Sequence, residues 1–426
     1  MSNTLRRYTC AFALLIVQSG VAYGESTLLS ELDVLTLDNA LTKSLSSNPD
    51  LVASGFELDA ARGRVQQAHL APNPQLTVAL EDALGSDAFT GFKSAEATIS
   101  LAWVIERRVR ERRVNVSLDR ETLIATDADL LRLDVAAETA RRFLDVLAVQ
   151  AQMTTADEAV RLAEDTIVAV TRRVEAGRTP SADLARAEAR LAAARLVRED
   201  LDHELSAGRH RLAAQWGQIA PEFVTVQGRL LSLPETVSFD ALRESMLDST
   251  DLTRYLSAER LAESELSLAQ AQSKPVWRAS LGVRRFEATN DQALLGSISI
   301  PLAIRNRNQG RIAETRAQVA KTRAEAAAAR VRLETKLYVF YESLQHSLHR
   351  ASVLRDQIIP RIESALSETH DAYELGRYSY MEWGAVQTEL IDARRELIAA
   401  SIDSHRHVIE IERLTGTRAV KLEESK

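Results

Sequence analysis

The sequence has 426 residues, of which 45% are hydrophobic but only 5% aromatic, and it contains 16 Gly and 9 Pro. Few glycines, prolines and aromatic rings in so long a chain are typical of long helices and coiled coils. The net charge of −7 gives no basic surface for nucleic acid, and the single cysteine, Cys10, excludes a disulfide framework and a thiolate metal site.

The N-terminus resembles a secretory signal peptide spanning residues 1–24. Arg6 and Arg7 precede an apolar run at 11–17, and Ala22-Tyr23-Gly24 places small residues where a signal peptidase requires them. We therefore expect cleavage after Gly24. No later apolar run approaches the roughly 20 residues of a membrane helix, so a membrane span in this chain would consist of strands.

The rest of the chain is a tandem duplication. Asp50-Leu51 aligns with Asp251-Leu252, and Gly177-Arg178 aligns with Gly376-Arg377, at offsets that differ only by a loop length. The predicted domains are a first structural repeat at 25–217, a linker or equatorial segment at 218–237, a second repeat at 238–416 and a C-terminal tail at 417–426.

Each repeat begins with a helical stretch, at 37–71 and at 238–273, and continues through two short alternating runs into a much longer helix. Residues 103–176 contain no Gly or Pro, so this helix could reach roughly 110 Å. Its counterpart at 311–359 is followed by Pro360, which predicts a kink. The return helix at 181–216 is about half as long as the outgoing helix, and we expect it to continue end to end with the first helix of the second repeat, at 238–273.

Turn and packing patterns support this arrangement. Gly177 and Gly376 suit the left-handed residue that closes a helix, and Thr179-Pro180 predicts an N-cap followed by the first helical residue. Ser379 with Glu382 predicts a capping box. Apolar residues recur by sevens from 312 to 340, which predicts a coiled-coil seam.

The short alternating runs, at 75–81, 94–101, 277–284 and 296–300, each have one apolar face. A four-stranded sheet cannot close on itself, and open edges are not tolerated in lipid, so several chains would have to pool strands into a water-filled barrel. The alternative is two soluble hairpins that pack their apolar faces on helices. In the barrel, the predicted lipid-facing residues are Leu76, Val78, Leu80, Ala97, Ile99, Leu101, Ala279, Leu281, Ile298 and Ile300.

Several segments carry a family resemblance. NPDLVASGFELDAARGRVQQAHLAPNPQL (48–76), SISIPLAIRNRNQGRIAE (297–314) and the paired turns VEAGRTPSADLARAEARL and YELGRYSYMEWGAVQTEL resemble the TolC-type outer membrane efflux family, most closely its CzcC-like heavy-metal cation branch. The resemblance runs from about residue 36 to 416. It fails at AWVIERRVRERR (102–113), where that branch usually has a Pro and a Gly-Gly-Lys-Arg.

The resemblance implies a mainly α fold with a small β part, assembled as a homotrimer with a 12-stranded β-barrel and a periplasmic α-helical barrel. It implies a place in the outer membrane of a Gram-negative bacterium and docking onto an inner-membrane efflux pump through a periplasmic adaptor protein. The family's pore-gate residues map onto Asp183, Glu382 and Tyr373. The tip turns that would dock the partner contain Gly177, Arg178, Thr179, Gly376, Arg377 and Ser379.

No sequence pattern points to catalysis or to a cofactor. The chain lacks phosphate-binding, metalloprotease and nucleophile-elbow motifs, so we expect no enzyme. Three histidine pairs have no accompanying carboxylate ligand, and we expect no stored metal: His203 and His210, His346 and His349, His405 and His407. The arginines near the strand ends are expected to be interfacial or solvated: Arg107, Arg108, Arg110, Arg305 and Arg307.

Three alternatives remain open at this point. Asp183 and Glu382 lie in first helical turns, where acids stabilise the helix dipole without any role in a pore. The duct could carry organic drugs or secreted proteins instead of metal cations. The chain could also be a soluble periplasmic coiled-coil adaptor or scaffold that never enters a membrane.

Overall fold

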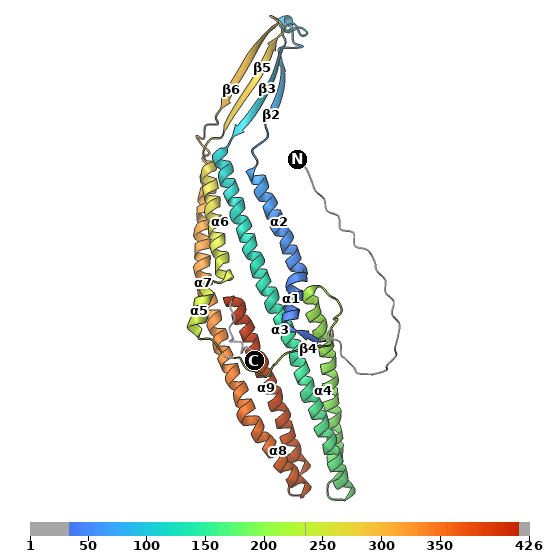
Figure 1. The fold of residues 1–426 in the computed structure, drawn as a ribbon. Helices are drawn as coiled ribbons and strands as arrows, with labels where there is room; N and C mark the ends of the chain where they lie inside the picture. Colours follow the sequence, from blue (N-terminus) through green and yellow to red (C-terminus); the bar gives the residue numbers. More distant parts are fainter. Residues whose placement is uncertain (1–33, 235, 417–426) are drawn as a thin grey trace, which may run out of the picture.

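A rod of long helices carries a four-stranded sheet at one end (Figure 1). The computed structural model describes residues 34–234 and 236–416. The expected signal peptide at 1–24 and tail at 417–426 lie outside the described residues. Among the described helices, none is both long and apolar enough to cross a membrane.

Hairpins from both repeats join in one antiparallel sheet with the order β2-β3-β5-β6. Its central pair is β3 with β5, so the two repeats meet through backbone hydrogen bonds, and β2 and β6 are left as free edges. A short 3-10 helix, η1 (Asp87–Phe89), lies in the β2–β3 loop. The strands are β2 (Gln75–Glu81), β3 (Glu96–Ile105), β5 (Trp277–Phe286) and β6 (Asp291–Ser299).

The first repeat has two helices before its strands, where the sequence predicted a single stretch at 37–71. The break is at Asn48, whose side-chain oxygen accepts hydrogen bonds from the backbone N–H groups of Asp50 and Leu51 at 2.9 and 3.2 Å. Pro49 then starts the next helix, as is typical of a first helical residue. The helices are α1 (Leu37–Ser47), α2 (Pro49–His69), α3 (Arg107–Glu175) and α4 (Ser181–Ala213), followed by the 3-10 turn η2 (Ala214–Trp216).

The second repeat follows the same order, with its own break at 248–249. A π-helical turn, Leu354–Ile358, interrupts the long helix just before Pro360, where the sequence predicted a kink. The helices are α5 (Phe239–Leu247), α6 (Thr250–Gln272), α7 (Gln309–Val353), α8 (Ile359–Glu374) and α9 (Tyr380–Thr415).

The shorter helices lie end to end within their own repeat. In Figure 1, α2 and α4 follow one another along α3, and α6 and α9 follow one another along α7 and α8. The shorter helices meet where α1 contacts η2 in the first repeat and where α5 contacts α9 in the second. The prediction that α4 continues into the second repeat is therefore wrong, because the segment between the repeats crosses the rod instead of extending it.

That crossing segment is an ordered part of the fold. Its strand β4 (Thr225–Gln227) pairs in parallel with β1 (Val34–Thr36). The Gln150 side chain of α3 bonds both backbone groups of Val226, at 2.9 and 3.1 Å. Further along, the Leu230 carbonyl lies 2.9 Å from Nε2 of His405 on α9. The segment thus ties the two repeats together around the middle of the rod.

The core of the rod is narrow and rich in small side chains. On the upper part of α7, the buried positions are Thr315, Val319, Thr322 and Ala329. The predicted seam from 312 to 340 shares only Val319 with this set, and its other members are partly buried. The threonine hydroxyls bond backbone carbonyls of their own helix, which lets these polar residues occupy a close helix–helix contact.

Candidate functional site

The end of the rod away from the sheet is formed by two helix-to-helix turns with the same backbone geometry. Gly177 and Gly376 adopt left-handed φ values of 67° and 75°, as predicted. In the first turn, Arg178 N–H bonds the Arg173 carbonyl at 2.9 Å, and in the second, Arg377 N–H bonds the Ala372 carbonyl at 2.8 Å. These are Schellman closures, so each turn is fixed by its own backbone.

The helices that leave the two turns start differently. The predicted capping box of α9 is confirmed: Glu382 accepts from the Ser379 N–H at 2.7 Å, and the Glu382 N–H bonds the Ser379 hydroxyl at 3.3 Å. In the other turn, the prediction that Thr179 is the N-cap is wrong. Helix α4 has Pro180 as its N-cap, and the Thr179 hydroxyl accepts a hydrogen bond from Nε of Arg173 instead.

Arg173, near the end of α3, connects the two turns. One guanidinium nitrogen donates to the carbonyl oxygens of Tyr373 and Glu374, at 2.6 and 3.2 Å. The guanidinium carbon also lies 4.8 Å from the centroid of the Tyr373 ring, a cation–π distance. A Cβ added at Gly376 would lie 3.3 Å from the Arg173 side chain, so glycine leaves this side chain its room as well as closing the turn.

Tyr373 is the centre of an aromatic cluster between the two hairpins. Only 1% of its surface is exposed, and its ring stacks on Trp383 at 4.9 Å with an interplanar angle of 26°. Burial raises the pKa of the Tyr373 phenol, although the nearby Arg173 charge opposes this shift. Ala187 and Val170 of the first repeat pack in the same cluster. The predicted gate tyrosine is therefore a contact inside the protomer, and it joins the two repeats.

The two predicted gate acids lie in the first turns of their helices. Glu382 is exposed, and Asp183 in α4 is partly exposed. Hydrogen bonds from the Ser379 backbone and hydroxyl, at 2.7 and 2.8 Å, favour the carboxylate and lower the pKa of Glu382. No capping hydrogen bond joins the side chain of the N-cap residue, Pro180, to α4. The two acids thus have different environments at equivalent positions.

The structure shows tip residues that the sequence did not reveal, chiefly Arg173 and Trp383. Their partners lie in the other hairpin, about 200 residues away, so no local pattern marks them. The available signal was divergence between the repeats: Arg173 aligns with Ala372, and Val174 with Tyr373, inside two otherwise similar turns.

The other candidate surface is the sheet, whose two faces differ in polarity. Register places the predicted apolar residues on one face, since Val78 pairs with Ile99 and Ile99 with Val283. The exception is Ile300, which lies just beyond the end of β6 at Ser299. The remaining predicted residues of β2, β3, β5 and β6 share that face: Leu76, Leu80, Ala97, Leu101, Ala279, Leu281 and Ile298.

The opposite face of the sheet is polar. Arg284 bonds Glu96 and Glu81, at 2.5 and 2.8 Å, near the loop end of the strands. Nearer the helices, the hydroxyls of Ser280 and Ser297 lie 2.8 Å apart. A surface of hydroxyls and paired charges suits contact with water.

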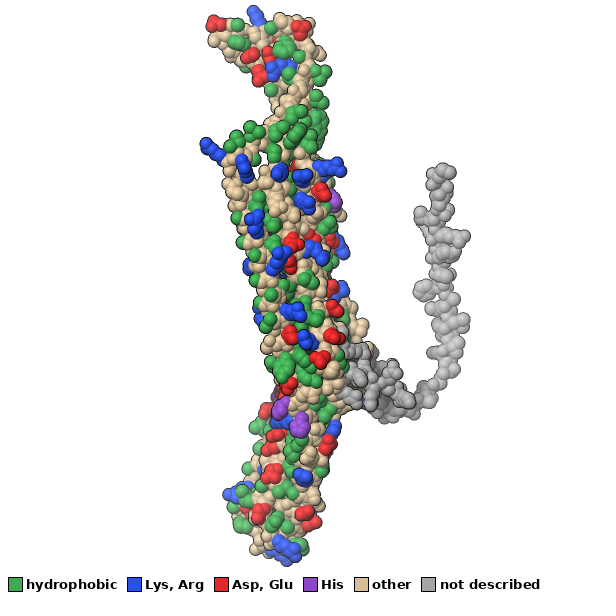
Figure 2. Space-filling view, turned by 90° about the vertical axis from the view of Figure 1, so that its left-hand side faces the viewer, with side chains coloured by type: hydrophobic (Ala, Val, Ile, Leu, Met, Phe, Trp, Pro, Cys, Tyr) green, Lys and Arg blue, Asp and Glu red, His purple; other side chains and the backbone are tan. Residues whose placement is uncertain are grey.

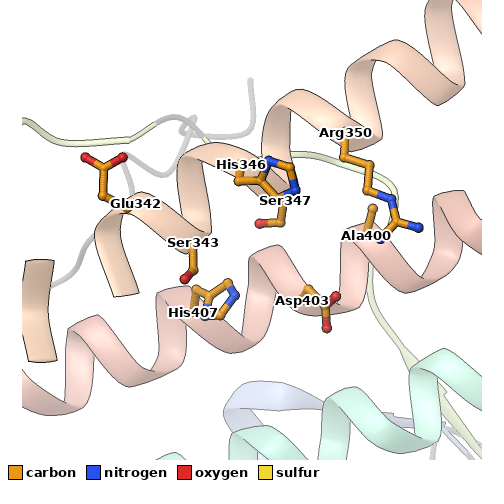
Figure 3. Close-up of a pocket in the computed structure, with 8 residues that line it drawn as sticks. All are labelled: Glu342, Ser343, His346, Ser347, Arg350, Ala400, Asp403 and His407. Carbon is orange, nitrogen blue, oxygen red and sulfur yellow. The ribbon is translucent and has the colours of Figure 1, made fainter. Parts of the chain in front are cut away.

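The histidines do not assemble a metal site. A cavity of about 500 Å³ between α7 and α9 is lined by His346 and Arg350 on one side and by Asp403 and His407 on the other (Figure 3). Within the described ranges, no group of three or more His, Cys, Asp or Glu side chains has a geometry that could hold a metal ion. The lining also contains Glu342, so two carboxylates and one guanidinium group surround the cavity.

Comparison with known proteins supplies the context for these two surfaces. Residues 40–218 match the family model described as "Outer membrane efflux protein". The cobalt-zinc-cadmium resistance protein CzcC of Cupriavidus metallidurans is 27% identical over 383 residues, covering 90% of each chain. The nickel-cobalt-cadmium resistance protein NccC of Alcaligenes xylosoxydans xylosoxydans is 25% identical, covering 68% of this chain and 67% of the other.

The fold is similar to that of a solved channel. The crystal structure of CusC, described in connection with transmembrane channel formation, superposes with a TM-score of 0.75. The two chains are 15% identical, and the superposition covers 89% of this chain and 91% of CusC.

Proposed function

We propose that this chain is the exit duct of a tripartite system that exports heavy-metal cations across the outer membrane, because residues 40–218 match the outer membrane efflux protein model and the fold is similar to that of CusC. The metal-resistance proteins CzcC and NccC, which it resembles along much of its length, supply the cargo class. The duct conducts passively and catalyses no reaction, since the energy comes from an inner-membrane pump.

The observation that carries the proposal is the four-stranded sheet with one apolar face, one polar face and two free edges. Exposed backbone groups at the edges β2 and β6 require partners in lipid. Three copies supply twelve strands, and pairing β2 of one copy with β6 of the next closes a barrel. The face that contains Val78 and Ile99 then contacts lipid, and the face that contains Ser280 lines water.

The interior suits passage of cations because it holds them weakly. Arg284 on the polar face is already paired with two carboxylates, and the hydroxyls nearer the helices carry no charge. A duct must release what enters it, so dispersed weak contacts serve conduction better than a tight site.

Three copies of the rod form a helical barrel through the periplasm, and the turns at its tip form the entrance. Asp183 and Glu382 of three copies place six carboxylates around that entrance, which favours cations over anions. The contact between Arg173 and Tyr373 holds the hairpins of each copy together in the resting state. The exposed turn residues Arg178 and Arg377 provide the surface that a periplasmic adaptor meets.

The first test is extraction and assembly. If the chain is an outer membrane duct, the protein should be extracted from outer membranes only with detergent. It should also behave as a trimer and form ion-conducting pores in a planar bilayer. Release by salt alone, as a monomer without conductance, would support the periplasmic scaffold instead.

The second test concerns cargo. Deleting the gene should sensitise the host to Co²⁺, Zn²⁺ or Cd²⁺ and leave its tolerance of organic dyes and detergents unchanged. Loss of tolerance to the organic compounds alone would assign the duct to drugs. Re-expression of the wild-type chain is the control in either case.

A further inference from the structure

Four exposed arginines lie at the corners where the strands give way to helices. Arg107, Arg108 and Arg112 lie in the first two turns of α3, and Arg305 lies in the loop after β6. Within the described part of the chain, no carboxylate lies within ion-pair distance of these four guanidinium groups. The chain as a whole has a net charge of −7, so this local excess of positive charge is not a consequence of composition.

A neighbouring arginine shows that internal partners are available at this corner. Arg113 donates to Glu106 at 2.8 Å and to the Leu70 carbonyl at 3.2 Å, which fixes the end of α3 against the end of α2. Arg113 therefore has a structural role within the protomer. The other arginines of these turns point to a partner outside it.

The end of the helix adds to the need for an anion. The first turn of α3 contains no acidic residue, and its N-cap, Glu106, makes no capping hydrogen bond. Cations are unfavourable at a helix N-terminus because the free N–H groups already carry partial positive charge. A negatively charged group held here would balance both the arginines and the helix end.

A collar of exposed apolar side chains lies on the sheet side of the same corner. Trp103 and Trp277 are exposed on the apolar face of the sheet, and Leu302 and Ile304 are exposed in the loop that leads to Arg305. Figure 2 shows this hydrophobic collar with Lys and Arg side chains gathered next to it on the helical part. Tryptophan followed by basic residues is the arrangement expected where acyl chains meet lipid headgroups.

We propose that these four arginines, Arg107, Arg108, Arg112 and Arg305, bind the phosphate groups of anionic phospholipids in the periplasmic leaflet of the outer membrane. The inference rests on the proposed function, because only an inserted duct places this corner at a leaflet. A net-negative lipid fits better than a zwitterionic one, whose ammonium group would meet the same arginines. Free phosphate fits less well, since it makes no use of the adjoining apolar collar.

The test compares lipid binding by trimers purified in detergent. Native mass spectrometry after addition of phosphatidylglycerol and phosphatidylethanolamine in equal amounts counts the bound molecules of each. A surface arginine contributes about a fivefold preference for an anionic lipid surface. The variant R107Q/R108Q/R112Q/R305Q should therefore lower the ratio of bound anionic to zwitterionic lipid by at least about tenfold.

The matched control removes the same charge from elsewhere on the rod. The variant R161Q/R260Q/R330Q/R332Q replaces four exposed arginines that also lack ion pairs among the described residues, and it should keep the wild-type ratio. Inorganic phosphate at matched concentration should not displace the lipid. Displacement by phosphate, or an equal effect of the two variants, would overturn the proposal.

Assembly of the variant provides a separate control. If the fourfold variant fails to form trimers, the double variant R112Q/R305Q and a NaCl titration of the wild type replace it, and both should weaken the anionic preference. A wild-type trimer without lipid preference, together with a variant that cannot assemble, would show that the arginines pair with a neighbouring protomer. Absence of a membrane-inserted wild-type trimer would instead refute the proposed function itself.

Discussion

The guanidinium group of Arg173 donates to the Tyr373 carbonyl at 2.6 Å and lies 4.8 Å from the centre of the Tyr373 ring. The two residues belong to different repeats, so this contact joins helical hairpins that have no covalent connection at the tip. The tyrosine ring is held from its other side by Trp383. In the proposed duct, the distance between the hairpins sets the width of the entrance. The contact between Arg173 and Tyr373 therefore restrains that width.

Replacing Arg173 with alanine should favour the open entrance. A hydrogen bond from a charged donor contributes about 1.5–3 kcal/mol, so the ratio of open to closed pores should rise by about 10- to 150-fold. Single-channel recording of the open probability measures this. Arg172→Ala is the matched control, because that side chain is exposed. Equal open probabilities for the two variants would show that the contact does not restrain the tip.

Removing the tip acids should reduce cation selectivity. The double variant D183A/E382A deletes six charges per trimer, so the reversal potential in a salt gradient should move toward zero and block by divalent cations should weaken. Assembly should survive, because loss of a cap costs about 1 kcal/mol. The variant E57A/E199A removes two exposed acids away from the tip and should leave selectivity unchanged. Wild-type selectivity in D183A/E382A would show that both acids act only at their helix ends and not in the pore.

The pH dependence of the entrance should follow Glu382. Hydrogen bonds from Ser379 lower its pKa below the ordinary value of 4.5. The capping box is therefore fully present above pH 4.5 and is lost as the pH falls through the lowered value. In a D183A background, cation selectivity should persist down to pH 4.5 and titrate only below it, whereas D183A/E382A should show no titration. A midpoint above pH 4.5 would mean that repulsion within the ring outweighs the cap.

The large elements of this fold could be predicted from simple patterns. The stretch without Gly or Pro at 103–176 gives α3, and the period-two alternation gives the strands of the sheet. The breaks at Asn48 and Ser249 were missed, although Asn-Pro is itself a helix-start pattern. The predicted end-to-end order of the short helices along the rod was wrong. That order depends on the path of the segment at 218–237, and no sequence periodicity predicts such a path.

Predictability at the tip stopped where contacts between the repeats begin. The left-handed glycines and the capping box are local, and the sequence predicts both correctly. The predicted Thr179 N-cap also rests on a local pattern, but it is wrong because the Thr179 hydroxyl accepts a hydrogen bond from Arg173 instead. Arg173 reaches that position because α3 and α8 end side by side, and the sequence pattern contains no information on their spacing.

Gly282 allows β5 to approach β3 closely in the sheet. A Cβ at this position would lie 2.7 Å from the Ile99 carbonyl oxygen, closer than real contacts allow. Gly282→Ala should destabilise the barrel by about 1–3 kcal/mol per subunit, visible as a lower melting temperature of the trimer in detergent. Gly296→Ala on β6 is the control, because its added Cβ would meet only the Leu281 side chain at 3.8 Å. Equal melting temperatures for both variants would show that β5 can shift to make room.

The assignment of the two faces of the sheet can be tested at neighbouring residues of β2. Val78 lies on the apolar face, where 69% of it is exposed in the single chain, and Thr77 points to the polar face. An arginine near the middle of a lipid-facing strand costs about 2–4 kcal/mol per subunit, so Val78→Arg should prevent insertion of the trimer.

Thr77→Arg adds the same charge one residue away, and the water-filled interior should tolerate it. The amount of trimer in purified outer membranes measures both variants against the wild type. The outcome that would contradict the assignment is equal yield, because neither face of β2 would then contact lipid. A reversed result, with Thr77→Arg excluded and Val78→Arg inserted, would show that the barrel has the opposite sense and that the polar face with Arg284 and Ser280 is turned outward.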